Sequence, residues 1–130
     1  MAHILVIDDD ESLRTALQEF LTRFGHRVSL AADGQEGLSF LREKKADIVI
    51  TDIFMPESDG LETILAIREM RRDDSVNLPV IAISGGIIGG ATPFCFLQQA
   101  EIFGANRVFP KPLDFSKIEN AVEELLPATG

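Results

Sequence analysis

The sequence is poor in positive charge. Its 12 lysines and arginines face 21 aspartates and glutamates, which gives a formal net charge of −9. A surface of this sign repels nucleic acids and anionic membranes at long range. The composition therefore disfavours a protein that binds nucleic acid directly.

Cysteine and long apolar runs are also scarce. Cys95 is the single cysteine, so no internal disulfide can form, which suits a reducing compartment. No segment approaches the roughly 18 apolar residues of a membrane-spanning helix, and the first residues, MAHILVIDDD, lack the basic region of a signal peptide. We therefore predict a cytoplasmic protein that does not insert into membranes.

Linker-like tracts are missing as well. The 130 residues, of which 45% are apolar, are enough for one hydrophobic core, and no long stretch rich in glycine, serine or proline divides them. We predict one domain over residues 1–130 with its core at about 3–126, and no output domain after it.

Apolar runs alternate with segments of helical periodicity along the chain. The predicted strands are 3–7, 27–31, 47–51, 79–84 and 107–109. The first predicted helix extends to Phe24 and is followed by Gly25, where a left-handed helix cap would lie. The second begins at Asp33 with a capping box to Glu36, and the third begins near Leu61. The fourth runs from Thr92 to Gly104, and the fifth begins at Asp114. Asp10 is predicted to cap the first of these helices.

Five strands that alternate with five helices indicate parallel pairing through right-handed crossovers. The most apolar strands, 3–7, 47–51 and 79–84, belong in the middle of the sheet. We therefore predict a doubly wound α/β domain of the flavodoxin-like (βα)5 type, with a five-stranded parallel sheet in the order 2-1-3-4-5. Ligands of such sheets bind at the carboxyl ends of the strands, where the strand order reverses.

Polar side chains follow the predicted strands at that edge. They are Asp8 and Asp9 after the first strand, Asp52 after the third, Ser84 after the fourth and Lys111 after the fifth. Three carboxylates in one cleft need a cation, and an all-oxygen site suits Mg²⁺. A hydroxyl, a cation and an ammonium group facing a carboxylate nucleophile can hold a transferring phosphoryl group.

These motifs match a family. From His3 to about Leu126 the chain resembles the receiver domain of bacterial two-component response regulators. The matching positions are Asp8 and Asp9, Asp52 in TDIFMPESDG, Ser84 in AIS and Lys111 in PKP. Four separate motifs in the expected order make the resemblance specific.

The resemblance implies a mechanism. Asp52 would be the phosphoacceptor, and the donor would be a phosphohistidine of a histidine kinase or a histidine phosphotransfer protein. Mg²⁺ would be held by Asp9, Asp52 and the main-chain carbonyl of Phe54, with Asp8 acting largely through water. Ser84 and Lys111 would contact the phosphoryl oxygens, and a cis peptide is expected before Pro112.

Two segments depart from the family pattern. Val108 stands where receivers commonly have a tyrosine or phenylalanine that reorients on activation, and Phe109 should point to the other side of its strand. The glycine-rich loop 85–92 is longer than usual and permits large backbone movement. Relay of the signal through an aromatic side chain is therefore not expected.

The leading hypothesis is a phosphorylation-activated switch that signals through protein–protein contact. It would catalyse its own phosphorylation and dephosphorylation only, and its target would be a separate protein. The contact face would comprise the helix after Thr92, the strand 107–109 and the helix after Asp114, and a homodimer through this face is an open alternative.

Two other functions stay open. One is a Mg²⁺-dependent phosphatase with an aspartyl nucleophile, although Phe54 occupies the position where such enzymes usually carry a second acid. The other is a receiver fold kept only for docking, which the intact acids and Lys111 disfavour. The two histidines, His3 and His26, have no partners at metal-ligand spacing, so we predict that they are structural or exposed.

Overall fold

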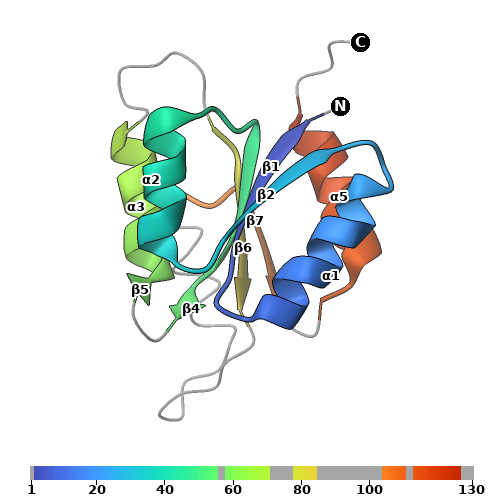
Figure 1. The fold of residues 1–130 in the computed structure, drawn as a ribbon, viewed down its shortest axis with the longest axis horizontal. Helices are drawn as coiled ribbons and strands as arrows, with labels where there is room; N and C mark the ends of the chain where they lie inside the picture. The colour runs from blue at the N-terminus through green and yellow to red at the C-terminus, as the bar shows by residue number, and fades with distance from the viewer. Residues whose placement is uncertain (1, 56–57, 71–77, 85–103, 111–112, 127–130) are drawn as a thin grey trace.

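Five parallel strands form the centre of the molecule, and helices cover both faces of the sheet (Figure 1). The structure is a computed structural model, and it describes residues 2–55, 58–70, 78–84, 104–110 and 113–126. The predicted helix from Thr92 and the cis peptide before Pro112 lie outside these residues.

The central strands are β1 (His3–Ile7), β2 (Arg27–Ala31), β3 (Ile48–Asp52), β6 (Val80–Ser84) and β7 (Arg107–Pro110). The described helices are α1 (Glu11–Thr22), α2 (Gly34–Glu43), α3 (Gly60–Met70) and α5 (Phe115–Leu125). Two short strands, β4 (Phe54–Met55) and β5 (Ser58–Asp59), pair antiparallel. The sequence predicts only a polar turn where β4 and β5 lie.

The strand order is β2-β1-β3-β6-β7, and neighbouring strands of this sheet are parallel. This order confirms the predicted 2-1-3-4-5 arrangement of a flavodoxin-like doubly wound domain. β1, β3 and β6 are the inner strands because their apolar runs can be covered on both faces. The chain passes from β1 to β2 on one side and then continues with β3 on the other side of β1. The strand order therefore reverses between β1 and β3, and the predicted ligand site lies at the carboxyl ends of these two strands.

The sheet separates two hydrophobic clusters. α2 and α3 cover one face, and α1 and α5 cover the other (Figure 1). Side chains alternate along each strand, as Leu5 and Ile7 of β1 belong to the first cluster while Ile4 and Val6 belong to the second. All four side chains are fully buried.

Aspartate side chains begin two helices as predicted. Asp10 Oδ1 accepts a hydrogen bond of 3.2 Å from the main-chain N–H of Leu13 at the start of α1. Asp114 Oδ1 accepts one of 3.0 Å from the N–H of Ser116 at the start of α5. Each aspartate satisfies helix N–H groups that have no partner within the helix.

The start of α2 differs in one bond from the predicted capping box. Asp33 Oδ1 accepts from the N–H of Glu36 at 2.9 Å, as expected. The Glu36 carboxylate, however, accepts from the N–H of Ala32 at 3.3 Å, one residue before the cap. Glu36 therefore binds the residue before the cap instead of the cap itself.

The end of α1 has the predicted left-handed glycine, but the helix is shorter than predicted. The helix ends at Thr22, and Gly25, with φ of +88°, follows in the turn to β2. Phe24 continues the apolar period of the helix but is 52% exposed because it lies beyond the helix end. Its ring still contacts Phe20, with 5.2 Å between the ring centroids.

Membrane insertion was not expected from the sequence. Among the helices that the structure describes, none is both long enough and apolar enough to cross a bilayer.

Arg68 joins the end of α3 to the beginnings of β6 and β7. Its Nη1 donates to the carbonyl of Leu78 at 2.5 Å, and its Nε donates to the carbonyl of Gly104 at 3.1 Å. Its Nη2 donates to Asn106 Oδ1 at 2.7 Å, and the same oxygen accepts from the N–H of Val80 at 2.9 Å. Partial burial lowers the pKa of the Arg68 guanidinium, which stays protonated at neutral pH.

We expect Arg68→Ala to lower the free energy of unfolding by about 2 kcal/mol, because it removes charge-assisted hydrogen bonds to main-chain carbonyls. Urea denaturation measures this difference. Arg23→Ala is the matched control, since the Arg23 side chain is exposed, and it should change the unfolding free energy by less than about 0.5 kcal/mol. Equal losses in the two variants would show that the Arg68 hydrogen bonds do not stabilise the fold.

Candidate functional site

Three aspartates meet at the carboxyl ends of β1 and β3. Asp8 follows β1 directly and Asp52 is the last residue of β3, and the pairing of Ile7 with Thr51 places these ends side by side. Carboxylate oxygens of Asp8, Asp9 and Asp52 lie within 4.8 Å of one another. We call these three residues the acidic cluster.

Burial differs among the three carboxylates. Asp8 is 0% exposed and Asp52 is 2% exposed, whereas Asp9 is exposed. The acidic cluster is therefore closed to solvent at Asp8 and Asp52 and open to solvent at Asp9.

Hydrogen bonds in the turn after β1 hold Asp8 in place, while Asp10 in the same turn caps a helix. Asp8 Oδ1 accepts from the N–H of Asp10 at 2.8 Å, and the N–H of Asp8 donates to the carbonyl of Ala31 in β2 at 3.1 Å. Arg14 Nη1 donates to the main-chain carbonyl of Asp8 at 2.8 Å, so its positive charge supports the turn. Asp10 meanwhile caps α1.

Main-chain hydrogen bonds also hold Asp52. It pairs with Ile83 of β6 in the sheet, and the N–H of the next residue, Ile53, donates to the carbonyl of Ile83 at 3.0 Å. The buried Thr51 hydroxyl donates to the Asp52 carbonyl at 3.1 Å. The Asp52 backbone is thus anchored to β6 before the chain turns into β4.

The donor set determines which ligand fits the acidic cluster. All three side chains offer carboxylate oxygens, which hard divalent cations prefer, and the exposed side leaves room for water ligands. Neighbouring carboxylates repel one another, and a cation between them removes this repulsion. The residues present therefore fit a hard divalent cation bound partly by water.

The other predicted site residues are placed only in part. Ser84 ends β6 beside Asp52 and pairs with Pro110, the last residue of β7, so its backbone lies at the same edge of the sheet. Phe54 begins β4, two residues after Asp52. Lys111, the loop 85–92 and the Ser84 side chain lie outside the described part of the chain.

Val108 and Phe109 occupy opposite faces of β7, as the alternation of the strand predicted. Val108 is half-buried and packs against the cluster under α2 and α3, beside its strand partner Ala82. Phe109 packs against the cluster under α1 and α5. Phe109 therefore cannot take the place of an aromatic side chain at position 108.

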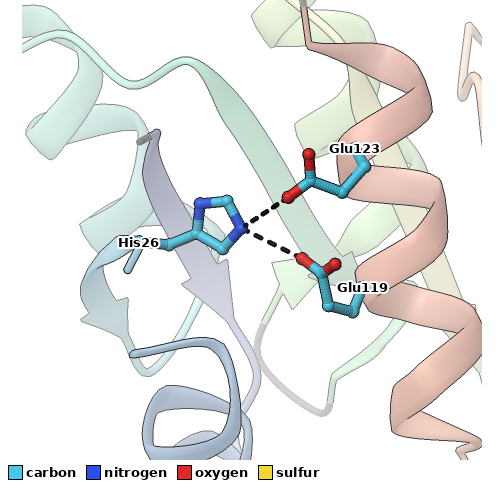
Figure 2. A group of neighbouring side chains, drawn as sticks. All are labelled: His26, Glu119 and Glu123. Atoms are coloured by element: carbon cyan, nitrogen blue, oxygen red, sulfur yellow. Dashed lines mark hydrogen bonds and ion pairs between the residues drawn. The ribbon is translucent and has the colours of Figure 1, made fainter. Parts of the chain in front are cut away.

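One cluster of titratable side chains was missed from the sequence. His26 is 5% exposed, and its Nε2 lies 3.0 Å from Glu119 Oε2 and 3.4 Å from Glu123 Oε1 (Figure 2). His26 is buried and hydrogen-bonded, which agrees with the structural role predicted for it, but its two glutamate partners were not predicted. The partners lie 93 or more residues along the chain, on α5, so only the fold brings them together.

His3 is structural, as predicted. Its Nε2 lies 2.7 Å from Ser29 Oγ, and its ring packs edge-on against Phe40 with 5.5 Å between the ring centroids. These contacts join β1 to β2 and α2.

A family model, described as the response regulator receiver domain, matches residues 4–123 of the chain. The transcriptional regulatory protein ZraR of Klebsiella oxytoca is 37% identical over 126 residues, which are 97% of this chain and 26% of the relative. The sporulation initiation phosphotransferase F of Bacillus subtilis is 27% identical over 124 residues, which are 95% of this chain and 93% of the relative.

Among solved structures, that of the chemotaxis protein CheY4 of Vibrio cholerae is similar, with a TM-score of 0.82 and 26% identity. The similarity covers 97% of this chain and 99% of that one. The chain spans only about a quarter to a third of the length of several transcriptional regulators that it matches, with values from 24% to 35%. The similarity to these regulators thus concerns one part of each.

Proposed function

Because the chain belongs to the receiver domains of two-component response regulators, we propose that Asp52 is its phosphoacceptor. Receiver domains are phosphorylation-activated switches that interact with histidine kinases or phosphotransfer proteins. The observation that carries the proposal is the position of Asp52, which is buried at the end of β3 within 4.8 Å of two further aspartates. The proposed donor is a phosphohistidine of a kinase or a phosphotransfer protein.

The proposed cofactor is Mg²⁺. Asp8, Asp9 and Asp52 would hold it together with the main-chain carbonyl of Phe54, and Asp8 would act largely through water. The all-oxygen donor set and the exposed side of the acidic cluster support this choice. When bound, Mg²⁺ screens the repulsion between the Asp52 carboxylate and the incoming phosphoryl group.

The proposed transfer requires little of the protein beyond position and charge. A carboxylate oxygen of Asp52 attacks phosphorus, the P–O bond forms, and the P–N bond of the donor histidine breaks. The electron pair of that bond stays on the imidazole nitrogen, which takes a proton from water. Ser84 and Lys111 are the residues that we propose for contacts with the phosphoryl oxygens.

Transmission of the signal is proposed to depend on backbone and charge rather than on an aromatic rotamer. Val108 occupies the position of the usual aromatic residue and is packed against the core. A charge near −2 on Asp52 can draw the segment after Ser84 toward the site. The proposed output is contact with a separate protein through a face that includes β7 and α5, and a homodimer through this face is the alternative.

The residue at position 54 disfavours a Mg²⁺-dependent phosphatase. Such enzymes usually carry an acid two residues after the nucleophile, where this chain has Phe54. The similar proteins are named as regulators, a phosphotransferase and a chemotaxis protein. The chain's own catalysis would be limited to its phosphorylation and dephosphorylation.

Incubation with Mg²⁺ and acetyl phosphate tests the proposal. We expect one phosphoryl group per chain that is stable in acid and labile to hydroxylamine, which are properties of an acyl phosphate. Phosphomonoesters serve as the matched control substrates. Repeated turnover of varied phosphomonoesters, or a label that survives hydroxylamine, would contradict a receiver mechanism and favour an enzyme.

A further inference from the structure

A second cluster of metal-ligating side chains lies far from the acidic cluster. His26 precedes β2, while Glu119 and Glu123 lie four residues apart on one face of α5 (Figure 2). Their ligand atoms lie within 4.8 Å of one another. His26 stands at the amino ends of β1 and β2, whereas the acidic cluster stands at the carboxyl ends of β1 and β3.

We propose that His26, Glu119 and Glu123, here called the His26 cluster, bind a first-row transition metal ion, for which Zn²⁺ is the test ion. One imidazole and two carboxylates are a donor set that Zn²⁺ accepts, with water completing four-coordination. Mg²⁺ prefers oxygen ligands alone, so the imidazole discriminates against it. The His26 cluster would thus bind Zn²⁺ even in the presence of excess Mg²⁺.

The spacing of the donor atoms supports this proposal. With metal–ligand distances of about 2.0–2.1 Å, two ligands of a tetrahedral zinc site lie about 3.3 Å apart. His26 Nε2 lies 3.0 Å from Glu119 Oε2 and 3.4 Å from Glu123 Oε1. Two of the distances between ligand atoms are therefore already close to those of a tetrahedral zinc site.

Burial makes one side of the cluster rigid and leaves the other open. The side chains of His26 and Glu119 are 2% and 8% exposed, and packing holds them in place. The Glu123 side chain is 58% exposed, so a metal and its water ligand can enter from that side. Two neighbouring carboxylates beside an imidazole also attract a divalent cation.

The proton on the imidazole must move when a metal binds. The N–H of Ala2 donates to His26 Nδ1 at 3.3 Å, so Nδ1 carries no proton and Nε2–H faces the glutamates. A metal at Nε2 shifts this proton to Nδ1, and the long hydrogen bond from Ala2 is given up. The shift between tautomers is a specific signature of metal binding.

Bound metal would also join elements that are distant in sequence. His26 lies directly before β2, and the two glutamates belong to α5. A ligand that binds only the folded state raises its stability. We therefore expect Zn²⁺ to raise the melting temperature of the wild-type chain in the presence of excess Mg²⁺.

Competition with a chromophoric zinc chelator, in excess Mg²⁺ to saturate the acidic cluster, tests the site. We expect Glu123→Gln to weaken Zn²⁺ binding by about tenfold or more, because loss of a supporting group alone costs a metal site 10–100-fold. Glu124→Gln is the matched control, as the Glu124 side chain is 65% exposed and lies 4.0 Å from Arg107. It should bind Zn²⁺ within about twofold of wild type.

Nitrogen-15 NMR of the two histidine rings gives an independent readout. At saturating Zn²⁺ we expect His26 to change from the Nε2–H to the Nδ1–H tautomer, while His3, which contacts Ser29, keeps its resonances. Equal Zn²⁺ affinity of wild type and Glu123→Gln, or unchanged His26 nitrogens at saturation, would overturn the proposal. Neither outcome depends on whether Asp52 is phosphorylated.

Discussion

Asp52→Asn should reduce phosphorylation by acetyl phosphate by at least about 10³-fold, the scale of loss when an enzyme loses its nucleophile. A carboxamide oxygen carries no negative charge and does not form a stable acyl phosphate. The substitution keeps the size of the side chain at the end of β3, where the Asp52 backbone is held by β6. Incorporation of radioactive phosphate per chain is the measurement.

Asp47→Asn is the matched control for this result. Asp47 is an exposed aspartate just before β3, and its Oδ2 accepts from the N–H of His3 at 2.8 Å. The control makes the same chemical change at the opposite end of the strand and should be labelled like wild type. Circular dichroism of both variants establishes that they fold. Full labelling of a folded Asp52→Asn would rule out Asp52 as the acceptor.

Asp9→Asn should lower the affinity for the Mg²⁺ that supports phosphorylation rather than abolish the reaction. The substitution removes one of the three carboxylates proposed to hold Mg²⁺ but leaves the proposed nucleophile in place. We expect the Mg²⁺ concentration for half-maximal labelling to rise by about tenfold or more, and high Mg²⁺ to restore most of the rate. Initial labelling rates over a Mg²⁺ titration measure the effect.

Asp10→Asn controls for the loss of a negative charge in the same turn. Asp10 caps α1, and asparagine caps helices about as well as aspartate, so the fold should be kept. Its half-maximal Mg²⁺ concentration should stay within about twofold of wild type, because the Asp10 carboxylate caps α1 and does not belong to the acidic cluster proposed to hold the ion. An equal shift in both variants would point to general surface charge instead of a bound metal.

Local chemistry explains why much of the fold could be predicted. A cap needs only an aspartate and the N–H groups two or three residues on, so Asp10, Asp33 and Asp114 were all identified from their neighbours in sequence. The apolar strands indicated the inner positions of the sheet in the same way. The predicted strand 47–51 begins one residue before β3, which spans Ile48–Asp52. An aspartate stands at each end of the apolar run, and the apolar pattern does not show which of the two belongs to the strand.

The acidic cluster could be predicted because parallel strands bring their carboxyl ends to one edge. Asp8 and Asp52 follow directly from the topology, and the structure places their carboxylates together with that of Asp9. The different burial of Asp8 and Asp9, 0% against exposed, was not predictable, since both residues follow β1 in a polar run. Burial there depends on how the turn packs against β2.

The His26 cluster shows what sequence patterns miss. Metal-ligand motifs are recognised by short spacing, and here the histidine and Glu119 are 93 residues apart. The spacing of four between Glu119 and Glu123 was visible, but such pairs are common on solvated helix faces. The packing of α1 beside α5 brings the turn before β2, and with it His26, to this helix.

The most direct test of the proposed mechanism is to identify the phosphorylated residue by mass spectrometry. Wild-type protein is phosphorylated with acetyl phosphate and Mg²⁺, reduced with borohydride, and digested for mass spectrometry. Reduction converts an aspartyl phosphate to homoserine and releases phosphate, so the modified residue is marked by its mass. We predict homoserine at position 52, and homoserine at position 8 or 9, or at none of the three, would contradict the proposed mechanism.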